Sequence, residues 1–251
     1  MGMSYNPYTL EGKTVLVTGA SSGIGRGAAI ECAKMGARVI ITARNEERLK
    51  ETLGLLEGEG HEMRVCDLSD NEAINAMVDS LPEVQGVVNN AGFTTIQPIQ
   101  FINEDVFQNI LQVNTMAPVL ILKYLLKKKK LKAGASVVFT SSLAGVGKMS
   151  VGNTMYGCSK GAISAFIQGA AKELASKRIR VNAVCPGFVE SKIMASGTIS
   201  DEQLEKLMDL YPLGRAGKPE DVAWAMIYLL SDASSWITGV NLPVDGGREL
   251  Y

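Results

Sequence analysis

Short apolar runs and longer amphipathic segments alternate along the chain. The runs are rich in β-branched residues, which is typical of buried strands, whereas the segments between them place apolar residues at helical spacing. The predicted strands cover residues 13–18, 38–43, 61–66, 86–89, 135–141, 178–184 and 240–244. The predicted helices cover residues 24–35, 46–56, 71–81, 104–130 and 219–230, and a further helix follows residue 153 and ends near 177. This alternation predicts an α/β fold, with a doubly wound parallel sheet and helices on both faces.

Two of the predicted helices carry unusual patterns. In the helix 104–130, Asn114 interrupts the apolar positions and Pro118 can bend the axis. Because an asparagine side chain competes for backbone hydrogen bonds, Asn114 is either an exposed residue or a kink whose freed backbone group serves a site. The helix after residue 153 has a face of small residues, which predicts close helix packing, either between subunits or within the chain. These small residues are Gly157, Gly161, Ala162, Ala165 and Gly169.

Composition narrows the classes of function. A chain of 251 residues, 46% of them hydrophobic, can bury a sizeable core, and we expect residues 1–251 to form a single domain. The net charge of −1 and the short apolar runs lead us to expect no nucleic-acid partner and no membrane-spanning helix. The four cysteines form no Cys-x-x-Cys pair, so we expect a reduced, cytoplasmic protein. With one histidine, His61, we expect neither a metal site nor histidine-based catalysis.

A glycine-rich turn joins the first predicted strand to the first predicted helix. It reads Gly19-Ala-Ser-Ser-Gly23-Ile-Gly25. Glycines let the backbone approach a ligand closely, and the free N–H groups at a helix start favour an anion. Strand, glycine turn and helix in this order predict a pyrophosphate site, with an ordinary tight turn as the alternative. The candidate cofactor residues here are Gly19, Ser21, Ser22, Gly23, Ile24 and Gly25.

The end of the second strand indicates which dinucleotide this site prefers. An acidic residue there would accept hydrogen bonds from the ribose hydroxyls of NAD, but the chain has Ala43 and Arg44. A guanidinium suits the extra phosphate of NADP. We therefore predict NADP, and NAD is the alternative if Arg44 only stacks on the adenine or faces solvent.

Further candidates follow two other strands. Asp67 and Leu68 come after the third strand, and Asn90, Ala91 and Gly92 come after the fourth. Because the carboxyl ends of parallel strands meet at one edge of the sheet, these residues are predicted to line the same site as the glycine turn.

Tyr156 and Lys160 are the candidates for acid–base chemistry. Four residues apart, they lie on one face of a helix. A free phenol titrates near ~10, and an ammonium group beside it is expected to lower the pKa of Tyr156. A phenol tuned in this way can exchange a proton with a substrate oxygen. The alternative is a chance pair on a solvated helix.

In the order and spacing of these motifs the chain resembles the short-chain dehydrogenase/reductase family, from about residue 10 to residue 247. The motifs are Thr18-Gly-Ala-Ser-Ser-Gly-Ile-Gly25, Asp67, Asn89-Asn-Ala-Gly92, Asn114, Ser142, Tyr156-x-x-x-Lys160 and Pro186-Gly187. The resemblance implies a Rossmann-type sheet of about seven strands. It also implies a homotetramer, or a homodimer, built on the two long helices.

The resemblance implies roles for four catalytic residues. Tyr156 is expected to exchange a proton with the substrate oxygen, and Lys160 to lower its pKa and hold the nicotinamide ribose. Ser142 is expected to donate a hydrogen bond to the carbonyl group. Asn114 is expected to hold a water molecule on the proton path.

The resemblance also assigns the segment after the sixth strand. The residues that follow Pro186 and Gly187 are expected to cover the nicotinamide and the substrate, with contacts from Val189 and Ser191. Ser191 stands where the family more often has threonine, which keeps the hydroxyl group.

Two further departures from the family pattern affect the prediction. Ser142 lies one residue further from the tyrosine than is usual, which leaves Ser141 as an alternative. Many members that prefer NADP carry a basic residue where this chain has Ser22, so the NADP prediction depends on Arg44.

Three functions fit the sequence. The first is NADP(H)-dependent carbonyl reduction, and the similarity to 3-oxoacyl-acyl-carrier-protein reductases makes a 3-oxoacyl thioester the candidate substrate. The second is an NAD-dependent secondary-alcohol, steroid or sugar-alcohol dehydrogenase. The third is a nucleotide-sensing protein without catalysis, against which the intact catalytic residues argue. The predicted apolar pocket suits either enzyme; its residues are Leu143, Met149, Met155, Ile193 and Met194.

A run of lysines bears on the carrier substrate. Cations are favourable at a helix C-terminus, so we interpret the run as a solvated helix end, with docking of an acidic carrier protein as the alternative. The run comprises Lys127, Lys128, Lys129, Lys130 and Lys132.

Overall fold

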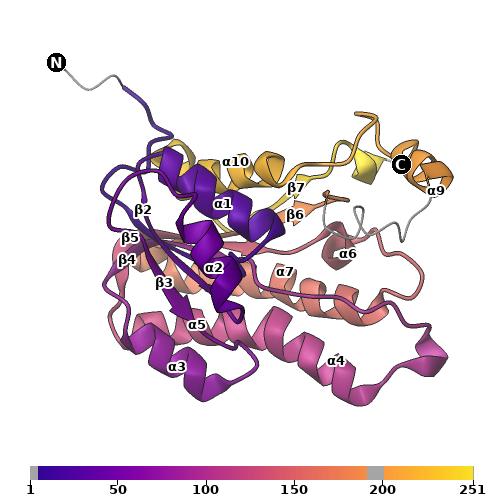
Figure 1. The fold of residues 1–251 in the computed structure, drawn as a ribbon, viewed down its shortest axis with the longest axis horizontal. Helices are drawn as coiled ribbons and strands as arrows, with labels where there is room; N and C mark the ends of the chain where they lie inside the picture. The colour runs from indigo at the N-terminus through magenta and orange to yellow at the C-terminus, as the bar shows by residue number, and fades with distance from the viewer. Residues whose placement is uncertain (1–4, 191–200, 251) are drawn as a thin grey trace.

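Seven parallel strands form one sheet in the computed structural model, which describes residues 5–190 and 201–250 (Figure 1). Their order is β3-β2-β1-β4-β5-β6-β7, and each neighbouring pair is parallel. The strands are β1 (Thr14–Thr18), β2 (Arg38–Ala43), β3 (Glu62–Val65), β4 (Val84–Asn89), β5 (Leu131–Thr140), β6 (Arg180–Pro186) and β7 (Asn241–Val244). The strand order reverses between β1 and β4, which is where open α/β sheets bind ligands. The predicted doubly wound sheet is confirmed.

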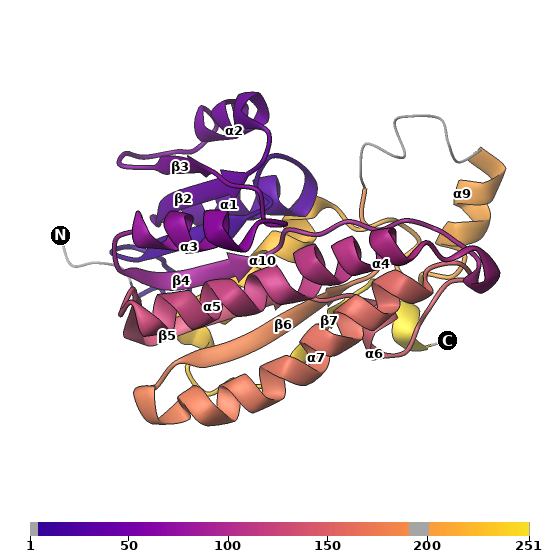
Figure 2. The ribbon, with the colours of Figure 1, turned by 90° about the horizontal axis from the view of Figure 1, so that it is seen from below.

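Helices cover both faces of this sheet. Helices α1, α2 and α10 lie on one face, and α3, α4, α5 and α7 lie on the other (Figures 1 and 2). Asn45, Asp70 and Asn103 begin α2, α3 and α4 by accepting hydrogen bonds from backbone N–H groups in the first turn. The α-helices are α1 (Gly23–Lys34), α2 (Glu46–Leu53), α3 (Asn71–Asp79), α4 (Glu104–Leu111), α5 (Ala117–Lys127), α6 (Leu143–Val146), α7 (Thr154–Leu174), α9 (Asp201–Met208) and α10 (Pro219–Leu230). Short 3₁₀ turns occur at Ile99–Phe101, Ala175–Lys177, Asp232–Ser234 and Arg248–Leu250.

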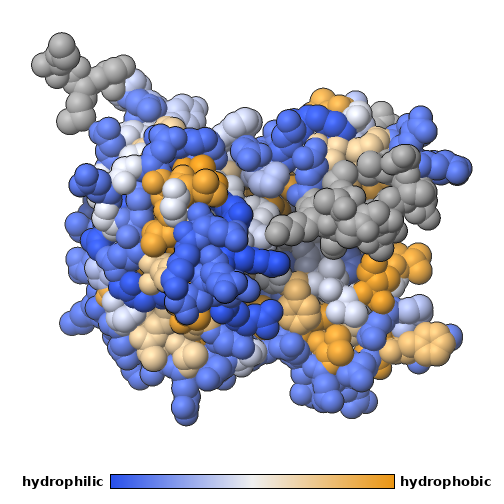
Figure 3. Space-filling model, in the orientation of Figure 1, coloured by the Kyte–Doolittle hydropathy of each residue, from blue (hydrophilic) through white to orange (hydrophobic). Residues whose placement is uncertain are grey.

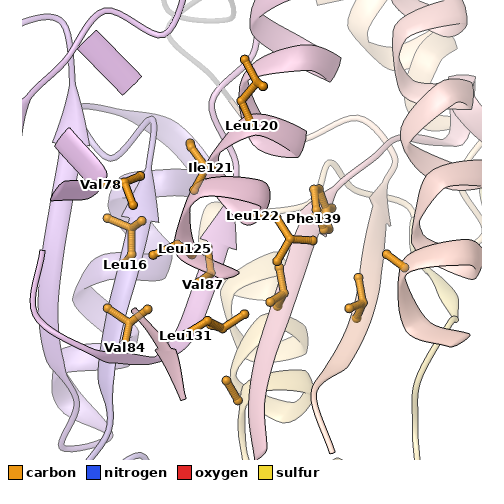
Figure 4. Close-up of a cluster of buried hydrophobic side chains, with 14 of the residues drawn as sticks. Leu16, Val78, Val84, Val87, Leu120, Ile121, Leu122, Leu125, Leu131 and Phe139 are labelled. Atoms are coloured by element: carbon orange, nitrogen blue, oxygen red, sulfur yellow. The ribbon is translucent and has the colours of Figure 1, made fainter. Parts of the chain in front are cut away.

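The hydrophobic core consists of two layers separated by the sheet. On one face, Leu16, Val87 and Phe139 of the sheet pack with Ile121 and Leu125 of α5 (Figure 4). On the other face, the sheet packs against α1 and α10. Because the central strands are buried on both faces, they consist of continuous apolar runs rather than alternating ones, as is typical of parallel sheets.

The predicted helix 104–130 changes from α to π geometry around Asn114 without a break in the helix. Between α4 and α5 the residues Gln112–Met116 form a π-helix. The Asn114 side chain is 1% exposed; its Nδ2 donates to the carbonyl oxygen of Phe93 at 2.9 Å, and its Oδ1 accepts from the Phe93 N–H at 3.0 Å. The predicted kink is confirmed, and it fastens the helix to the segment after β4. Such π segments frequently occur at functional sites.

The continuous helical stretch Glu104–Lys127 is long and apolar enough to cross a membrane by length and composition alone. Its apolar side, however, packs inside the domain, where Ala117, Ile121 and Leu125 are fully buried against the sheet and α3. This stretch is therefore a core helix of the fold.

Candidate active site

A cavity of about 550 Å³ opens at the carboxyl edge of the sheet, beside the reversal between β1 and β4. The glycine turn, the ends of β2 and β3, the segment after β4 and helix α7 form its walls. The predicted residues that line it are Gly19, Ser21, Ser22, Gly23, Ile24, Arg44, Asp67, Leu68, Asn90, Ala91, Gly92, Tyr156, Lys160 and Val189. Residues from most of the chain length therefore meet at one place, as expected for the carboxyl edge of a parallel sheet.

The glycine turn packs closely against the segment after β4. A side chain at Gly25 would place its Cβ 2.3 Å from the carbonyl oxygen of Gly19 and 2.5 Å from Nδ2 of Asn90. The Asn90 side chain donates to the carbonyl oxygen of Thr18 at 3.3 Å and accepts from the Thr140 hydroxyl at 3.2 Å. Gly25 thus permits the close approach without itself lining the cavity, and Asn90 uses its polar atoms to join β1 to β5.

Two arginines border the end of the cavity near β2. Arg44 lies directly after β2, as predicted, and Arg48 in the first turn of α2 lines the same wall. Sequence analysis missed Arg48, although a helix start directly after Arg44 was a usable signal. Facing them is Asp67, whose carboxylate accepts from the N–H and hydroxyl of Ser69 at 2.9 and 2.8 Å. These bonds, together with the Arg44 charge, hold the pKa of Asp67 below its ordinary value.

Tyr156, Lys160 and Ser142 come together at the α7 side of the cavity. The Nζ atom of Lys160 lies 5.6 Å from the centre of the Tyr156 ring and donates to the carbonyl oxygen of Thr140 at 2.7 Å. Lys160 is only 3% exposed. The Ser142 hydroxyl lies close enough to the Tyr156 phenol to act on its pKa. The arrangement provides a proton on a phenol, a hydroxyl beside it and a buried cation nearby.

The pKa values of this pair differ from the prediction. Burial raises the pKa of Tyr156 above its ordinary value, although the Ser142 hydrogen bond acts in the opposite direction. Burial lowers the pKa of Lys160 to about 8. Lys160 therefore loses its proton before Tyr156 does, and it carries no charge at the pH where the phenol ionises. The predicted lowering of the Tyr156 pKa is wrong for the protein alone, and the phenol is protonated at neutral pH.

The structure distinguishes the two candidate serines. Ser141 is 1% exposed, and its hydroxyl lies 3.1 Å from the carbonyl oxygen of Lys160 and 2.7 Å from Oγ of Ser164. Ser142 instead begins α6, accepts from the Ala144 N–H at 3.2 Å and reaches Tyr156. The geometry favours Ser142 as the hydroxyl that meets a substrate.

Replacing Ser142 with alanine is expected to lower kcat by about 10²-fold, because one donor to the developing charge is lost. Ser141→Ala is the matched control. It is expected to lower the melting temperature, because two buried hydrogen bonds are lost, while kcat stays within about threefold of the wild type. Steady-state kinetics and thermal unfolding of both variants check this assignment, and the reverse pattern would assign the role to Ser141.

Residues at the end of β6 do not line the cavity themselves. Pro186 ends β6, and a side chain at Gly187 would place its Cβ 3.0 Å from the Tyr211 ring and 3.1 Å from Cα of Asp245. Gly187 therefore allows close packing at the base of the following segment. The N–H of Phe188 next to it donates to the Tyr211 hydroxyl at 2.9 Å. Ser191 lies outside the described residues.

The predicted apolar pocket is not found where it was expected. Leu143 and Met155 are 5% and 1% exposed and belong to the packed interior, and Met149 is half exposed. The described part of the cavity wall includes none of the three, and 193 and 194 lie outside the described residues. Exposed apolar side chains instead lie on two neighbouring segments, with Ile96 on one and Val151 on the other.

Figure 3 shows how polarity is distributed on the face over α2. The surface there is largely hydrophilic, and apolar patches appear at the end of the molecule where the Ile99–Phe101 turn lies (Figures 1 and 3). The arginine-bordered end of the cavity is thus suited to a charged group, and the far end to a less polar one.

Comparisons with known proteins identify the family of this chain. A family model described as enoyl-(acyl carrier protein) reductase matches residues 19–249. A 3-oxoacyl-[acyl-carrier-protein] reductase of Rickettsia bellii is 36% identical over 95% of this chain and 97% of its own. A tropinone reductase homolog of Arabidopsis thaliana is 36% identical over 97% of this chain and 92% of its own.

Solved structures extend the comparison to three dimensions. The structure of a putative 2-deoxy-D-gluconate 3-dehydrogenase of Agrobacterium tumefaciens with bound NADP has a TM-score of 0.90 and 29% identity, and the match covers 98% of this chain and 100% of that one. A putative short-chain alcohol dehydrogenase of Sinorhizobium meliloti has a TM-score of 0.89 and 31% identity, over 98% and 99% of the two chains. With the sheet order, the glycine turn and the Ser142–Tyr156–Lys160 cluster in place, the chain belongs to the short-chain dehydrogenase/reductase family of oxidoreductases.

Proposed function

We propose that the protein is an NADP(H)-dependent oxidoreductase that transfers a hydride between nicotinamide and a carbonyl or secondary alcohol. The observation that carries this proposal is one cavity with a protonated phenol at one wall and two arginines at another. Tyr156 provides the proton, and Arg44 and Arg48 provide the cations. The bound NADP in the similar Agrobacterium structure supports the choice of cofactor.

The residues around the cavity fit a dinucleotide. The donors at the glycine turn and the two arginines suit phosphate groups, and no acidic residue stands at the end of β2 to repel them. The start of α1 at Gly23 and Ile24 would hold the pyrophosphate, Arg44 the extra phosphate, and Lys160 the nicotinamide ribose. Bound there, the nicotinamide supplies or accepts the hydride.

Tyr156 and Ser142 provide the proton transfer and the hydrogen bond that the reaction needs at the substrate oxygen. Because the pKa of Tyr156 is raised, its hydroxyl keeps a proton at neutral pH and can donate it to a substrate oxygen that is gaining negative charge. Ser142 stabilises the same oxygen by a hydrogen bond. A protonated donor is what carbonyl reduction requires, and the same phenol, once deprotonated, would accept the proton in alcohol oxidation.

Asn114 lies directly behind the cavity wall at Gly92 and Phe93 and does not line the described cavity itself. Its side chain is fully engaged with the backbone of Phe93 and with Oγ of Ser159 at 3.1 Å. We propose that its role is to hold the π segment and the wall at Gly92 and Phe93, and that any water on the proton path is bound by backbone groups there.

A 3-oxoacyl thioester is the first candidate substrate, because similar chains are named for it. The lysine run adds little to this choice. It lies at the amino end of β5, about 30 Å along the strand from the cavity at Thr140. Lys128 forms an ion pair with Asp79, and Lys130 donates to the carbonyl oxygen of Leu81, which supports a solvated helix end. The carrier protein therefore remains a candidate partner without an assigned docking surface.

A turnover assay tests this function. The protein, NADPH and a short 3-oxoacyl thioester are mixed, and the loss of reduced-nicotinamide absorbance is followed, with NADH, simple ketones and secondary alcohols in parallel. We expect consumption of NADPH to depend on the carbonyl substrate. Faster turnover of alcohols with NAD would favour the secondary-alcohol dehydrogenase instead.

Replacing Arg44 with aspartate is expected to weaken NADPH binding by about 10²-fold, because a charge-assisted bond becomes a repulsion. NADH lacks the extra phosphate, so its dissociation constant should change by no more than about threefold. Lys127→Asp makes the same change of charge at the opposite end of the sheet and is the control. Titrations by nucleotide fluorescence check the prediction, and equal weakening for both nucleotides would show that Arg44 does not contact the phosphate.

We further propose that residues 1–251 act as one cytoplasmic domain that assembles as a homotetramer. The described walls of the cavity come from one sheet and from the turns and helices that connect its strands, which supports a single domain. The small face of α7 is open to solvent at Ala162, Ala165 and Gly169, and a Cβ at Gly169 would meet no atom within 4 Å. This supports the subunit contact over packing within the chain. Light scattering of the purified protein tests the assembly.

A further inference from the structure

Two side chains hold the glycine turn from the side opposite the cavity. The Thr52 hydroxyl in α2 donates to the carbonyl oxygen of Ala20 at 2.9 Å. The guanidinium of Arg26 in α1 donates from Nη2 to the carbonyl oxygen of Ser21 at 2.8 Å. Neither Thr52 nor Arg26 lines the described cavity wall. Consecutive carbonyl groups of the turn are therefore fixed by residues outside the site.

The two side chains form one network. Nε of Arg26 donates to Oγ1 of Thr52 at 2.9 Å, and its Nη2 forms an ion pair with Glu51 at 2.9 Å. Thr52 is fully buried, and its hydroxyl also lies 3.0 Å from the carbonyl oxygen of Arg48. The network thus connects the turn to α2, which carries one of the two cavity arginines.

The two carbonyl contacts also fix the direction of the N–H groups of Ser21 and Ser22. In a trans peptide unit the C=O and N–H point in opposite directions, and the described chain contains no cis bond. With the carbonyls of Ala20 and Ser21 turned toward Thr52 and Arg26, the N–H groups of Ser21 and Ser22 point the other way. Both serines line the cavity. Within residues 5–190 and 201–250, neither N–H has an acceptor.

The position of these N–H groups indicates their ligand. The N–H of Ala20 donates to the carbonyl oxygen of Thr42 at 3.3 Å, which places this part of the turn beside the end of β2 and Arg44. Two N–H groups that have no acceptor in the described chain, beside an arginine, suit a phosphate. Ser22, moreover, stands where many family members that prefer NADP carry a basic side chain.

We infer that Arg26 and Thr52 are positioning residues for NADP selectivity. They hold the Ser21 and Ser22 N–H groups toward the extra phosphate of NADP. There the two N–H groups replace the basic side chain that many NADP-preferring family members carry at the position of Ser22. The inference rests on the proposed NADP(H)-dependent function. It assigns part of the cofactor preference to residues that do not touch the cofactor.

Nucleotide titration of Thr52→Val, with Thr52→Ser as the matched control, tests this. Valine keeps the volume but removes the donor, whereas serine keeps the donor. We expect Thr52→Val to raise the dissociation constant of NADPH about tenfold and that of NADH less than about twofold. Thr52→Ser should stay within about twofold of the wild type for both nucleotides. At saturating NADPH, kcat should be unchanged, so the effect appears in KM alone.

Arg26→Met provides an independent variant, because the Arg26 side chain is partly exposed and methionine keeps its apolar stem while removing its donors. It is expected to reduce the preference for NADPH over NADH in the same sense. Equal weakening for both nucleotides, or no weakening in either variant, would overturn the inference. A wild-type protein that bound neither nucleotide would overturn the proposed function, and the inference with it.

Discussion

Replacing Tyr156 with phenylalanine is expected to lower kcat on the order of 10³-fold, because the only phenol on the described cavity wall is removed. The ring stays, so the packing around it and the approach of Lys160 are retained. Binding of NADPH should therefore change by no more than about twofold. Steady-state kinetics at saturating cofactor, together with nucleotide titration of the same preparation, separate the two effects.

Tyr124→Phe is the matched control for this variant. Tyr124 is a half-buried tyrosine on α5, whose ring lies near the lysines at positions 123 and 128 rather than in the cavity. It should retain wild-type turnover. If Tyr156→Phe turned over substrate as fast as Tyr124→Phe, the proton donor would have to be another group.

Replacing Lys160 with methionine is expected to make the protein more stable and nearly inactive. Burial lowers the pKa of Lys160 from 10.5 to about 8, so a charge is held inside the protein at neutral pH. That shift corresponds to a cost on the order of 3 kcal/mol in the free energy of unfolding. Methionine fills the same space without charge but loses the bond to the Thr140 carbonyl. We expect a net gain of about 1–2 kcal/mol at pH 7.

The pH dependence identifies the cause of this gain. The folded-state pKa lies below the unfolded value, so the unfolded chain binds more protons between about pH 8 and 10.5, and the wild type gains stability as the pH rises through this range. The advantage of Lys160→Met should be full below pH 8 and shrink above it. Chemical unfolding at pH 7 and pH 9.5, with the exposed Lys172→Met as control, measures this. A pH-independent difference would show that packing, not charge, is responsible.

Much of the fold follows from the sequence because the local signals agree with the global arrangement. The runs at 38–43 and 219–230 are bounded by clear turn, cap and proline signals, and the structure has β2 and α10 with those same bounds. The start of β5 was missed. Leu131 is preceded and followed by lysines, and its strand pairing is irregular opposite Val84 to Gly86. Tertiary pairing extended this strand where local composition favoured a turn.

The site residues could be predicted where their type and spacing along the chain are enough to identify them. The glycines and strand-end polar residues could be predicted because parallel strands bring their carboxyl ends together, and the Tyr156–Lys160 pair because residues four apart share a helix face. The direction of the Tyr156 pKa shift could not be predicted, because burial raises this pKa more than the Ser142 hydrogen bond lowers it, and the depth of burial is a property of the fold. The positioning role of Arg26 and Thr52 could not be predicted from the sequence either, because it depends on the orientation of two peptide units in the glycine turn.

Hydride transfer itself can be measured directly with NADPH carrying deuterium at the transferred position of its nicotinamide ring. The protein is incubated with this cofactor and the carbonyl substrate that gives the fastest turnover, and the product is examined by mass spectrometry. The account predicts an alcohol with one deuterium on the former carbonyl carbon, formed by the wild type and formed on the order of 10³-fold more slowly by Tyr156→Phe. NADPH that binds tightly but leaves every carbonyl and alcohol tested unlabelled and unchanged would contradict it, and would favour a nucleotide-sensing protein without catalysis.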